Sequence, residues 1–586
     1  MNPNESRKKG LLADFLLAAL ALILYCVYVK IILPEPFLLN DQLLFREIAS
    51  GVYTGSPDGH LVYIMHPLGA ALAKLYKLIP SVEWYNVLML STFPIHCFVL
   101  VFAFSSVCKR TLAKFFTAVL VLLTFVGTTV YFTIQNEYTV NAGVIAASAL
   151  ILLIISNYVG DHLGRFYTGL SVVLFTVSCL MRKNIFYTAI PLILFTGVFL
   201  FFSKKKLTRY ITGVCVLAGV LALCFLAESL AYSSPEWVEY VKYNEARSRI
   251  FDYEGLPDYE SNKGLYDSLE ISREEFTALS KDFGLVKNVD SKKLEALADA
   301  SERMREGVTK ANFKERIWYQ FRDEVDLWVR QPIGFFTVIL WMITVVLIFA
   351  DALASRKGAR ILLAVFPIGT AVYYVAFVLL FIYLGRYPDR VSVPFGYIIF
   401  AFSAGILAVT LKESPLWVLK SRKPAGFVLV LISILLILLN VKFIPGKVKR
   451  GLANRVFIDA YIELTAKTAE ICREDPESIY FVNLRIANWE TIDTAKDGFF
   501  DTPANFVPLV YWISGSPVHS EHLKLIGIDS PADALTDFDN VYYIAYEDYD
   551  LSWLTDLCRF YGKERELTET ETLTVPTGTI AVYKIQ

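Results

Sequence analysis

Asn40 and Asp41 form a polar pair just beyond a long apolar run over residues 12–34, and they are the first candidates for chemistry in this chain. A carboxylate held at the boundary of a membrane is partly desolvated, and desolvation raises its basicity. We therefore interpret Asp41 as a candidate general base that Asn40 can orient by hydrogen bonding. The alternative is that the pair caps a helix beginning at Gln42, and both interpretations can hold together.

Other charged residues also lie near the ends of apolar runs. Glu137 is the only acid in the short connection 135–138 and is a candidate second carboxylate, although a polar residue in such a turn is ordinary. Arg46 and Glu47 follow Asp41 on the expected helix and can pair with each other or with Asp41. For Glu47 we favour a solvated surface charge.

Two short connections carry paired cations. Arg182 and Lys183 are adjacent in one of them, and Arg386 and Arg390 flank Asp389 in another. Arginine offers forked donors to a phosphate and lysine offers a point charge, so these residues predict binding of an anionic group. For the first pair the alternatives are lipid headgroups or a wrong assignment of sides, and for the second a salt bridge that stiffens the turn.

A polar and aromatic stretch over residues 243–253 contains Arg247 and Tyr253. Sugar rings are bound by such mixtures of aromatic faces and hydrogen-bonding groups, so both are candidate substrate-binding residues, although packing against another segment would explain each one singly. His96, in an apolar run, would by default suggest function in a membrane. A neutral histidine bonded to a neighbouring helix is the commoner case.

These residues must be positioned by helices in a membrane. The chain has 586 residues, 55% of them hydrophobic, with a mean hydropathy of +0.47, and the apolar residues are gathered in blocks. About 20 apolar residues make one spanning helix, so the sequence predicts an α-helical polytopic membrane protein with about eleven transmembrane helices. The predicted runs are residues 12–34, 86–107, 113–134, 139–157, 166–181, 185–202, 210–232, 332–354, 361–384, 391–410 and 424–443, with the ends of the short fifth run uncertain.

Alternate connections are rich in Lys and Arg, which marks the cytoplasmic side. We therefore expect a cytoplasmic N-terminus and an extracytoplasmic C-terminal segment, in an integral plasma membrane protein of bacterial type. The net charge of −1 gives no reason to expect a nucleic-acid partner. The basic connections contain Arg7, Lys8 and Lys9; Lys109, Arg110 and Lys114; Lys204, Lys205, Lys206 and Arg209; Arg356, Lys357 and Arg360; and Lys412, Lys420, Arg422 and Lys423.

The chain divides into four predicted parts. They are an N-terminal transmembrane module over 1–232 with a first outer loop over 35–85, an extracytoplasmic helical insertion over 233–331, a second transmembrane module over 332–444, and a small extracytoplasmic α/β domain over 445–586.

Local signals support the two extracytoplasmic parts. Ser234-Pro235 predicts a helix start, and Ser272 with Glu275 resembles a capping box. In the tail we expect a helix near 457–472 and strands near 478–484, 540–545 and 579–585. Cys472 and Cys558 are the two cysteines placed to pair outside the membrane, which spacing alone does not show. No cysteine spacing suggests a metal site.

The first outer loop contains a second motif besides Asp41, which is His66-Pro67-Leu68-Gly69 with Lys74 downstream. Together they resemble the acid and the His-Pro-Pro-Leu-Gly-Lys element of the membrane glycosyltransferases of the C-type fold, in particular protein O-mannosyltransferase-like and aminoarabinose-transferase-like members. The departures are the single proline after His66 and Asn40 in place of a second acid. The subfamily is therefore left open.

The resemblance implies transfer of a sugar from a polyprenyl-phosphate donor to an extracytoplasmic glycan, lipid or protein, with inversion and with Asp41 as the base. We expect Arg182, Lys183, Arg386 and Arg390 to stabilise the departing lipid phosphate. A divalent metal is left open. The alternatives are a polytopic transporter or flippase, which usually shows related halves, and a non-catalytic surface-binding membrane protein.

Overall fold

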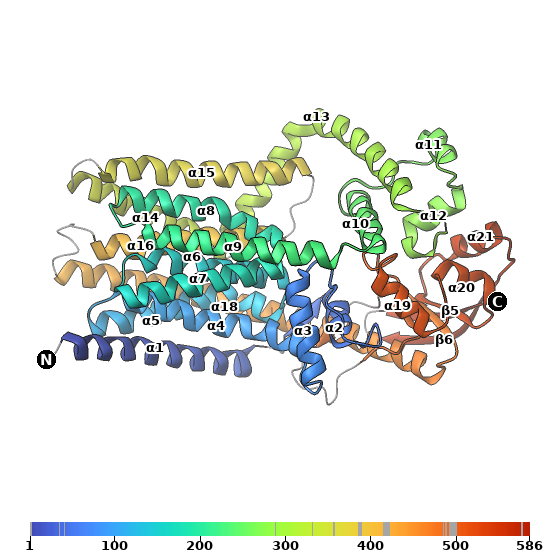
Figure 1. Ribbon diagram of the computed structural model, residues 1–586, viewed down its shortest axis with the longest axis horizontal. Coiled ribbons are helices and arrows are strands. Elements are labelled where there is room, and N and C mark those ends of the chain that lie inside the picture. Colours follow the sequence, from blue (N-terminus) through green and yellow to red (C-terminus); the bar gives the residue numbers. More distant parts are fainter. Residues whose placement is uncertain are drawn as a thin grey trace.

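The computed structural model describes residues 3–33, 36–39, 41–287, 289–330, 332–354, 358–384, 389–413, 422–483, 486, 489–491, 501–575 and 578–586. Figure 1 shows an elongated molecule, in which a bundle of long helices meets smaller helices and a β-sheet at one end. We call this the sheet end. The C-terminus lies at the sheet end and the N-terminus at the opposite end of the bundle (Figure 1).

Eight helices within the described residues are long and apolar enough to cross a membrane. They are α1 (Pro3–Ile32), α4 (Trp84–Val107), α5 (Thr111–Ile134), α6 (Tyr138–Ser156), α7 (Asp161–Met181), α8 (Lys183–Phe202), α9 (Thr208–Ala231) and α16 (Asp389–Glu413). The remaining predicted runs lie in α14 (Pro332–Ala354), α15 (Gly358–Leu384) and α18 (Arg422–Glu474). Each of the eleven predicted runs coincides with a helix, and the fifth is longer than expected because α7 already begins at Asp161. The protein is a polytopic helical membrane protein.

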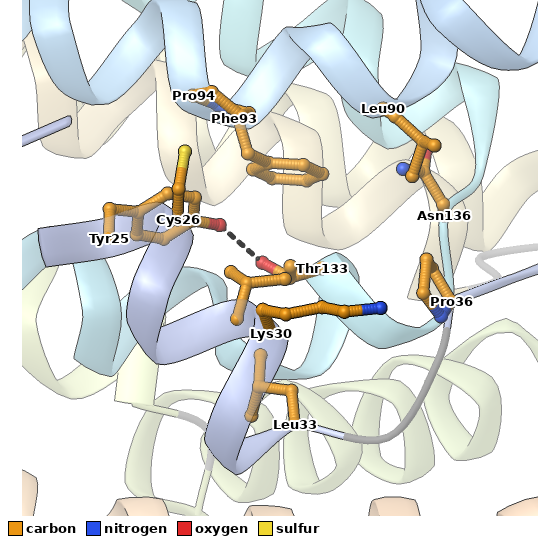
Figure 2. A pocket seen from close by; sticks show the side chains of 11 residues that line it. Tyr25, Cys26, Lys30, Leu33, Pro36, Leu90, Phe93, Pro94, Thr133 and Asn136 are labelled. Carbon is orange, nitrogen blue, oxygen red and sulfur yellow. Dashed lines mark hydrogen bonds between the residues drawn. The ribbon is translucent and has the colours of Figure 1, made fainter. Parts of the chain in front are cut away.

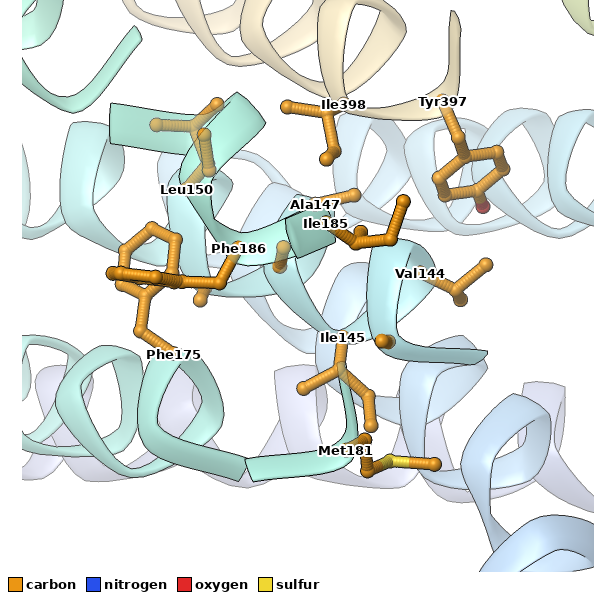
Figure 3. Packing of buried hydrophobic residues seen from close by; sticks show 14 of the residues in the cluster. Val144, Ile145, Ala147, Leu150, Phe175, Met181, Ile185, Phe186, Tyr397 and Ile398 are labelled. Atoms are coloured by element: carbon orange, nitrogen blue, oxygen red, sulfur yellow. The ribbon is translucent and has the colours of Figure 1, made fainter. Parts of the chain in front are cut away.

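Helix α6 forms the centre of the bundle. All 19 of its residues are buried, and α4, α7, α8 and α16 pack around it. Figure 3 shows Val144, Ala147 and Leu150 of α6 among side chains of the neighbouring helices. A helix that is apolar on every face is suited to such a central position. A Cβ built on Gly143 would lie 2.4 Å from Pro394 Cβ of α16, so a glycine is needed for this close approach.

Helices of the first outer loop and of the insertion cover the sheet end of the bundle, and the predicted helix starts are confirmed. Ser234 Oγ accepts from Trp237 N, and Ser272 and Glu275 form a complete capping box. The elements are α2 (Gln42–Ser50), α3 (His66–Leu78), α10 (Pro235–Ser248), the π-helix η1 (Arg249–Glu254), η2 (Glu260–Asn262), α11 (Lys263–Ser268), α12 (Arg273–Lys281), η3 (Phe283–Leu285) and α13 (Ser291–Arg330).

The C-terminal segment forms a mixed five-stranded sheet of order β4-β2-β5-β7-β6. The three predicted strands are confirmed as β2 (Ile479–Val482), β5 (Val541–Tyr546) and β7 (Gly578–Ile585), and the sequence did not predict β4 (Phe506–Pro508), β6 (Leu567–Val575), α19 (Pro517–Leu525), α20 (Pro531–Asp537) and α21 (Ser552–Phe560). Alternate residues of a strand point to opposite faces. Phe481 and Tyr543 accordingly pack in one core with α21, whereas Tyr480 and Val482 pack in another with α18.

Two segments that are far apart in sequence meet beside the first outer loop. Strand β1 (Phe37–Leu39) pairs antiparallel with β3 (Trp489–Thr491). Helix α18 runs without a break from the bundle into the sheet end, across position 445, and the division into four parts remains a prediction. All eight cysteines are free, and Cys472 and Cys558 are buried in different cores.

The predicted insertion packs directly on the sheet. Ala278 and Leu285 belong to the same core as the strand residues Phe481 and Tyr543. At the edge of this contact, Lys287 Nζ lies 2.8 Å from Asp533 Oδ1, and Lys287 N donates to the Tyr561 hydroxyl at 2.8 Å. Tyr543 also donates a hydrogen bond to the buried carboxylate of Asp282.

Candidate active site

Asp41 lies between strand β1 and the first turn of α2. Its backbone carbonyl accepts a hydrogen bond from Phe45 N at 3.0 Å, so it occupies the N-cap position and the helix begins at Gln42, as predicted. The Asp41 side chain, however, makes no capping hydrogen bond. The helix start therefore does not use the carboxylate.

The charges of three arginines from distant elements act on the Asp41 carboxyl. Arg182 joins α7 to α8, Arg247 lies in the last turn of α10, and Arg390 lies in the first turn of α16. Burial raises the pKa of the Asp41 carboxyl, and the charges of Arg390, Arg182 and Arg247 oppose this rise without cancelling it. The fold thus brings together one basic carboxylate and three guanidinium groups that are dispersed along the sequence.

Two tyrosines hold the Arg182 guanidinium. Its central carbon lies 5.2 Å from the ring centroid of Tyr63 and 5.4 Å from that of Tyr138. Cation–π contacts of this kind favour a positive charge over the ring face. The hydroxyl of Tyr63 also accepts a hydrogen bond from Arg247 Nη2 at 3.1 Å, so one phenol links two of the three arginines.

Glu137 is the N-cap residue of α6. Its Oε2 accepts from Val140 N at 3.1 Å, and its Oε1 accepts from Thr139 Oγ1 at 2.8 Å. The residue is only 6% exposed. Burial raises the pKa of this carboxyl, while Thr139, Arg390, Val140 and Arg182 lower it. Glu137 thus lies close to two of the arginines, with both of its oxygens engaged by α6.

Asp252 is a site residue that we did not select from the sequence. Its charge raises the pKa of Asp41, its Oδ2 accepts from Ser248 Oγ at 2.8 Å, and Arg247 Nη2 lies 3.6 Å from it. The π-helical η1 follows Arg247, and such a turn brings together residues five apart. Tyr253, which we did select, is 43% exposed.

A strained turn positions Tyr63. Val62 has φ = 61°, and Tyr63 N donates to Leu61 O at 2.6 Å, so the three residues form a γ-turn. A β-branched residue at positive φ is rare and costs about 1–3 kcal/mol. Tyr232 opposes this cost, since its hydroxyl accepts from Val62 N at 3.2 Å. Strain of this type is concentrated at functional sites.

His66 and Lys183 meet in a second cluster around Glu228. His66 N, at the start of α3, donates to Glu228 Oε2 at 2.5 Å, and the charge of Lys183 acts on the same carboxylate. The His66 ring lies 4.6 Å from that of His60, which is bonded to Asp58 Oδ1 at 2.7 Å. Burial, followed by the charge of His60, lowers the pKa of His66.

The prediction for Glu47 was wrong, because this carboxylate is buried. Its Oε1 accepts from Thr502 Oγ1 at 2.7 Å and lies 3.5 Å from Arg46 Nη2. Arg46 is itself fully buried and bonds Asp501 Oδ1 at 3.1 Å. Helix periodicity could not reveal this, since the covering segment comes from the far end of the chain.

Two predicted site residues, Asn40 and Arg386, lie outside the described residues. The side chain of His96 is buried and bonded to Ser148, which agrees with the commoner interpretation of a lone histidine. Over the part of the chain that the structure describes, no group of three or more His, Cys, Asp or Glu residues is placed to hold a metal ion.

No family model matches the chain, and no curated protein matches it. Solved structures resemble it over nearly its whole length, and two of them are of one protein. ArnT from Cupriavidus metallidurans bound to undecaprenyl phosphate is 10% identical, with a TM-score of 0.46, and the match covers 97% of each chain. The apo state of the same protein gives 10% identity and a TM-score of 0.44, with 96% of this chain and 97% of that chain covered.

Proposed function

We propose that this protein transfers a sugar from a polyprenyl-phosphate donor to an acceptor hydroxyl at the sheet end of the bundle. One observation carries the proposal. The carboxylate of Asp41, unused by its helix and with a raised pKa, lies among Arg182, Arg247 and Arg390 where spanning helices end. Sugar transfer from a lipid phosphate needs both a base for the acceptor and cations for the leaving group.

In the proposed reaction, Asp41 takes the proton of the acceptor hydroxyl as that oxygen attacks the anomeric carbon. The bond between the anomeric carbon and the phosphate oxygen breaks in the same step, so the anomeric centre is inverted. The electron pair leaves with the lipid phosphate, where negative charge develops. Arg182 and Arg390 stabilise that charge, and fixed cations act most strongly on charge that develops in the transition state.

The other predicted residues take supporting roles in this proposal. Glu137 holds Arg182 and Arg390 in place by its fixed negative charge, rather than acting as a second base, since both its oxygens accept hydrogen bonds. Arg247 contacts the sugar together with Asp252. Arg386, Asn40 and Tyr253 keep their predicted roles in phosphate binding, orientation of Asp41 and sugar binding.

His66 and Lys183 lie beside Glu228 and would meet the substrate at the edge of the site. We further propose that the sheet end faces the outside of a bacterial plasma membrane, with the N-terminus in the cytoplasm. No step of the proposed reaction requires a metal.

The test is transfer by purified protein in liposomes, assayed with a panel of undecaprenyl-phosphate sugars and with membrane lipid extract as acceptor. We expect Asp41→Asn to lower the transfer rate about 10²- to 10⁴-fold, because a positioned base contributes that much. The variant should still bind undecaprenyl phosphate, since the arginines remain. Asp267→Asn is the control, because Asp267 is an exposed partner of Lys263 in the insertion.

Transfer by Asp41→Asn at the rate of the control would contradict the proposal. Movement of lipid-linked sugar across the liposome without transfer, equal in the wild type and in Asp41→Asn, would favour the transporter. Failure of every polyprenyl-phosphate probe to bind would favour the non-catalytic surface protein.

A further inference from the structure

A pocket of about 280 Å³ lies between α1, α4 and α5, and none of the residues that line it is an arginine. Figure 2 shows Phe93 and Leu90 of α4 on one side, Tyr25 and Lys30 of α1 on the other, and Thr133 at the end of α5. The only polar pair that crosses it in this view is the hydrogen bond between Tyr25 and Thr133, at 2.7 Å. The lining is otherwise mainly apolar, so water gains little by filling it.

Lys30 gives the pocket a charge at its mouth. It lies in the last turn of α1, is exposed, and is close to where the hydrocarbon layer ends. In Figure 2 its ammonium group extends along the pocket toward Pro36 instead of turning away from the helices. Within the described residues no carboxylate is paired with it. A lysine at this level of a spanning helix attracts the phosphate of a lipid headgroup.

We propose that this pocket binds one acyl chain of an anionic phospholipid, whose phosphate pairs with Lys30. Its volume fits such an occupant, since a cavity of about 150 Å³ holds one benzene ring and 280 Å³ would take a chain segment on the order of ten carbons. A sugar would find too few hydrogen-bonding partners in it.

The bound lipid would support the candidate active site. Asn136 forms a wall of the pocket and is followed directly by Glu137. The Asn136 carbonyl accepts from Gln42 Nε2 at 3.0 Å, and Gln42 follows Asp41. A chain packed against Asn136 would therefore steady the backbone next to both carboxylates. The binding does not depend on the proposed sugar transfer, and only this effect on the rate rests on it.

The experiment measures retained lipid on the full-length protein in phosphatidylcholine nanodiscs containing 20% phosphatidylglycerol, by native mass spectrometry. We expect the wild type to retain one phosphatidylglycerol. Lys30→Gln should lower its preference over phosphatidylcholine roughly fivefold, as expected for one lysine near a lipid phosphate. Leu90→Trp should remove the retained lipid by filling the pocket.

Two matched controls keep the test specific. Lys77→Gln removes an exposed charge at the end of α3, and Val27→Trp adds bulk to an exposed face of α1 outside the pocket. Both should retain lipid as the wild type does.

Lipid retention by Leu90→Trp equal to that of Val27→Trp would overturn the proposal. So would an equal loss of preference in Lys77→Gln and Lys30→Gln, which would indicate general surface charge. If Leu90→Trp does not fold, the comparison of Lys30→Gln with Lys77→Gln tests the proposal without it. Displacement of the retained lipid by equimolar undecaprenyl phosphate would overturn the choice of occupant and assign the pocket to a polyprenyl chain.

Discussion

Asp41 illustrates how neighbouring charges set the basicity of a single carboxyl. Burial raises its pKa, the charges of Arg390, Arg182 and Arg247 lower it, and Asp252 raises it again. A base needs a pKa near the working pH, because it must be deprotonated and still accept a proton well. Asp252 and Arg247 therefore shift the pKa of this proposed base in opposite directions from the same short segment.

This opposition predicts two shifts of the pH–rate profile. Asp252→Asn removes a negative neighbour, so the pKa of Asp41 falls and the acid limb of kcat/KM moves to lower pH. Arg247→Gln removes a positive neighbour, so the acid limb moves to higher pH and the rate below it drops severalfold. The measurement is kcat/KM for sugar transfer between pH 4 and 8.

Arg249→Gln is the matched control for charge on the same segment. Arg249 pairs with Asp299 and Glu302, at 2.7 and 2.6 Å, away from Asp41, and its loss should leave the acid limb in place. Equal profiles for Asp252→Asn and Arg247→Gln would show that neither charge acts on the base.

The sequence contained part of this site. Asp41 could be found because it follows an apolar run at the expected membrane boundary, and Arg182 and Arg390 because positive charge is disfavoured in short extracytoplasmic connections. Tyr63 could not be found from the sequence, because a tyrosine in a loop has no distinguishing pattern and its position depends on the γ-turn at Val62. Asp252 was hidden by the π-helical turn, because α-helical spacing does not place it beside Arg247.

Among the elements, α6 and α16 make a close contact one helical turn from Arg390. Gly143 of α6 lies against Pro394, and Pro394 follows Arg390 by one helical turn in α16. Residues four apart lie on the same side of a helix. The close approach of these two helices therefore fixes the depth at which Arg390 emerges beside Asp41.

Gly143→Ala is expected to destabilise the protein by about 1–3 kcal/mol, because its Cβ would overlap Pro394. It should also lower sugar transfer by displacing Arg390. Thermal unfolding in detergent, monitored by tryptophan fluorescence, measures the first effect and the liposome assay measures the second.

Gly169→Ala in α7 is the control. A Cβ at Gly169 meets nothing within 4 Å, so this change should be neutral or stabilising by about 0.5–1 kcal/mol from reduced backbone freedom. Equal stability of the two variants would mean that α16 moves aside freely, and the proposed positioning of Arg390 would fail.

Elements were predictable where one physical pattern fixes them. Hydrophobic length located the eight helices of the described residues that are long and apolar enough to cross a membrane, and capping side chains located the starts of α10 and α12. Strands β4 and β6 were missed for different reasons: β4 has only three residues, and in β6 threonine and glutamate interrupt the apolar residues. The pairing of β1 with β3 could not be predicted, because each strand is only three residues long and so short a segment carries no sequence signal of its partner or register.

For the whole molecule, the contact between the insertion and the sheet contains a titratable group. Asp282 is buried, and burial raises its pKa to about 7, although hydrogen bonds from Tyr543 and Asn483 and the charge of Lys281 oppose this. When the insertion separates from the sheet, the carboxyl returns to its ordinary pKa of 3.8. Between these values the docked state binds more protons, so docking weakens as the pH rises from about 4 to 7.

Asp282→Asn should remove this pH dependence, because the amide oxygen still accepts from Tyr543 but has no proton to lose. At pH 8 the free energy of docking of the insertion on the sheet can become more favourable by about 4 kcal/mol, at about 1.4 kcal/mol per unit of pKa. Hydrogen exchange of residues 541–546, corrected for intrinsic rates, measures it at pH 5 and pH 8.

Asp533→Asn, at the same contact, is the control and should keep the pH dependence. Its charge is paired with Lys287, and hydrogen bonds from Lys287 and Ser530 lower its pKa. A slope that survives in Asp282→Asn would assign the titration to another group.

The strand pairing beside Asp41 has a consequence for how the protein is made. Strand β1 emerges early from the ribosome, but its partner β3 is about 450 residues further along the chain. Arg46 and Glu47 likewise make their contacts with Asp501 and Thr502 only after that later part of the chain has been synthesised. A nascent chain whose membrane helices are already inserted therefore still lacks the contacts made by β3, Asp501 and Thr502, so the surroundings of Asp41 are completed late in synthesis.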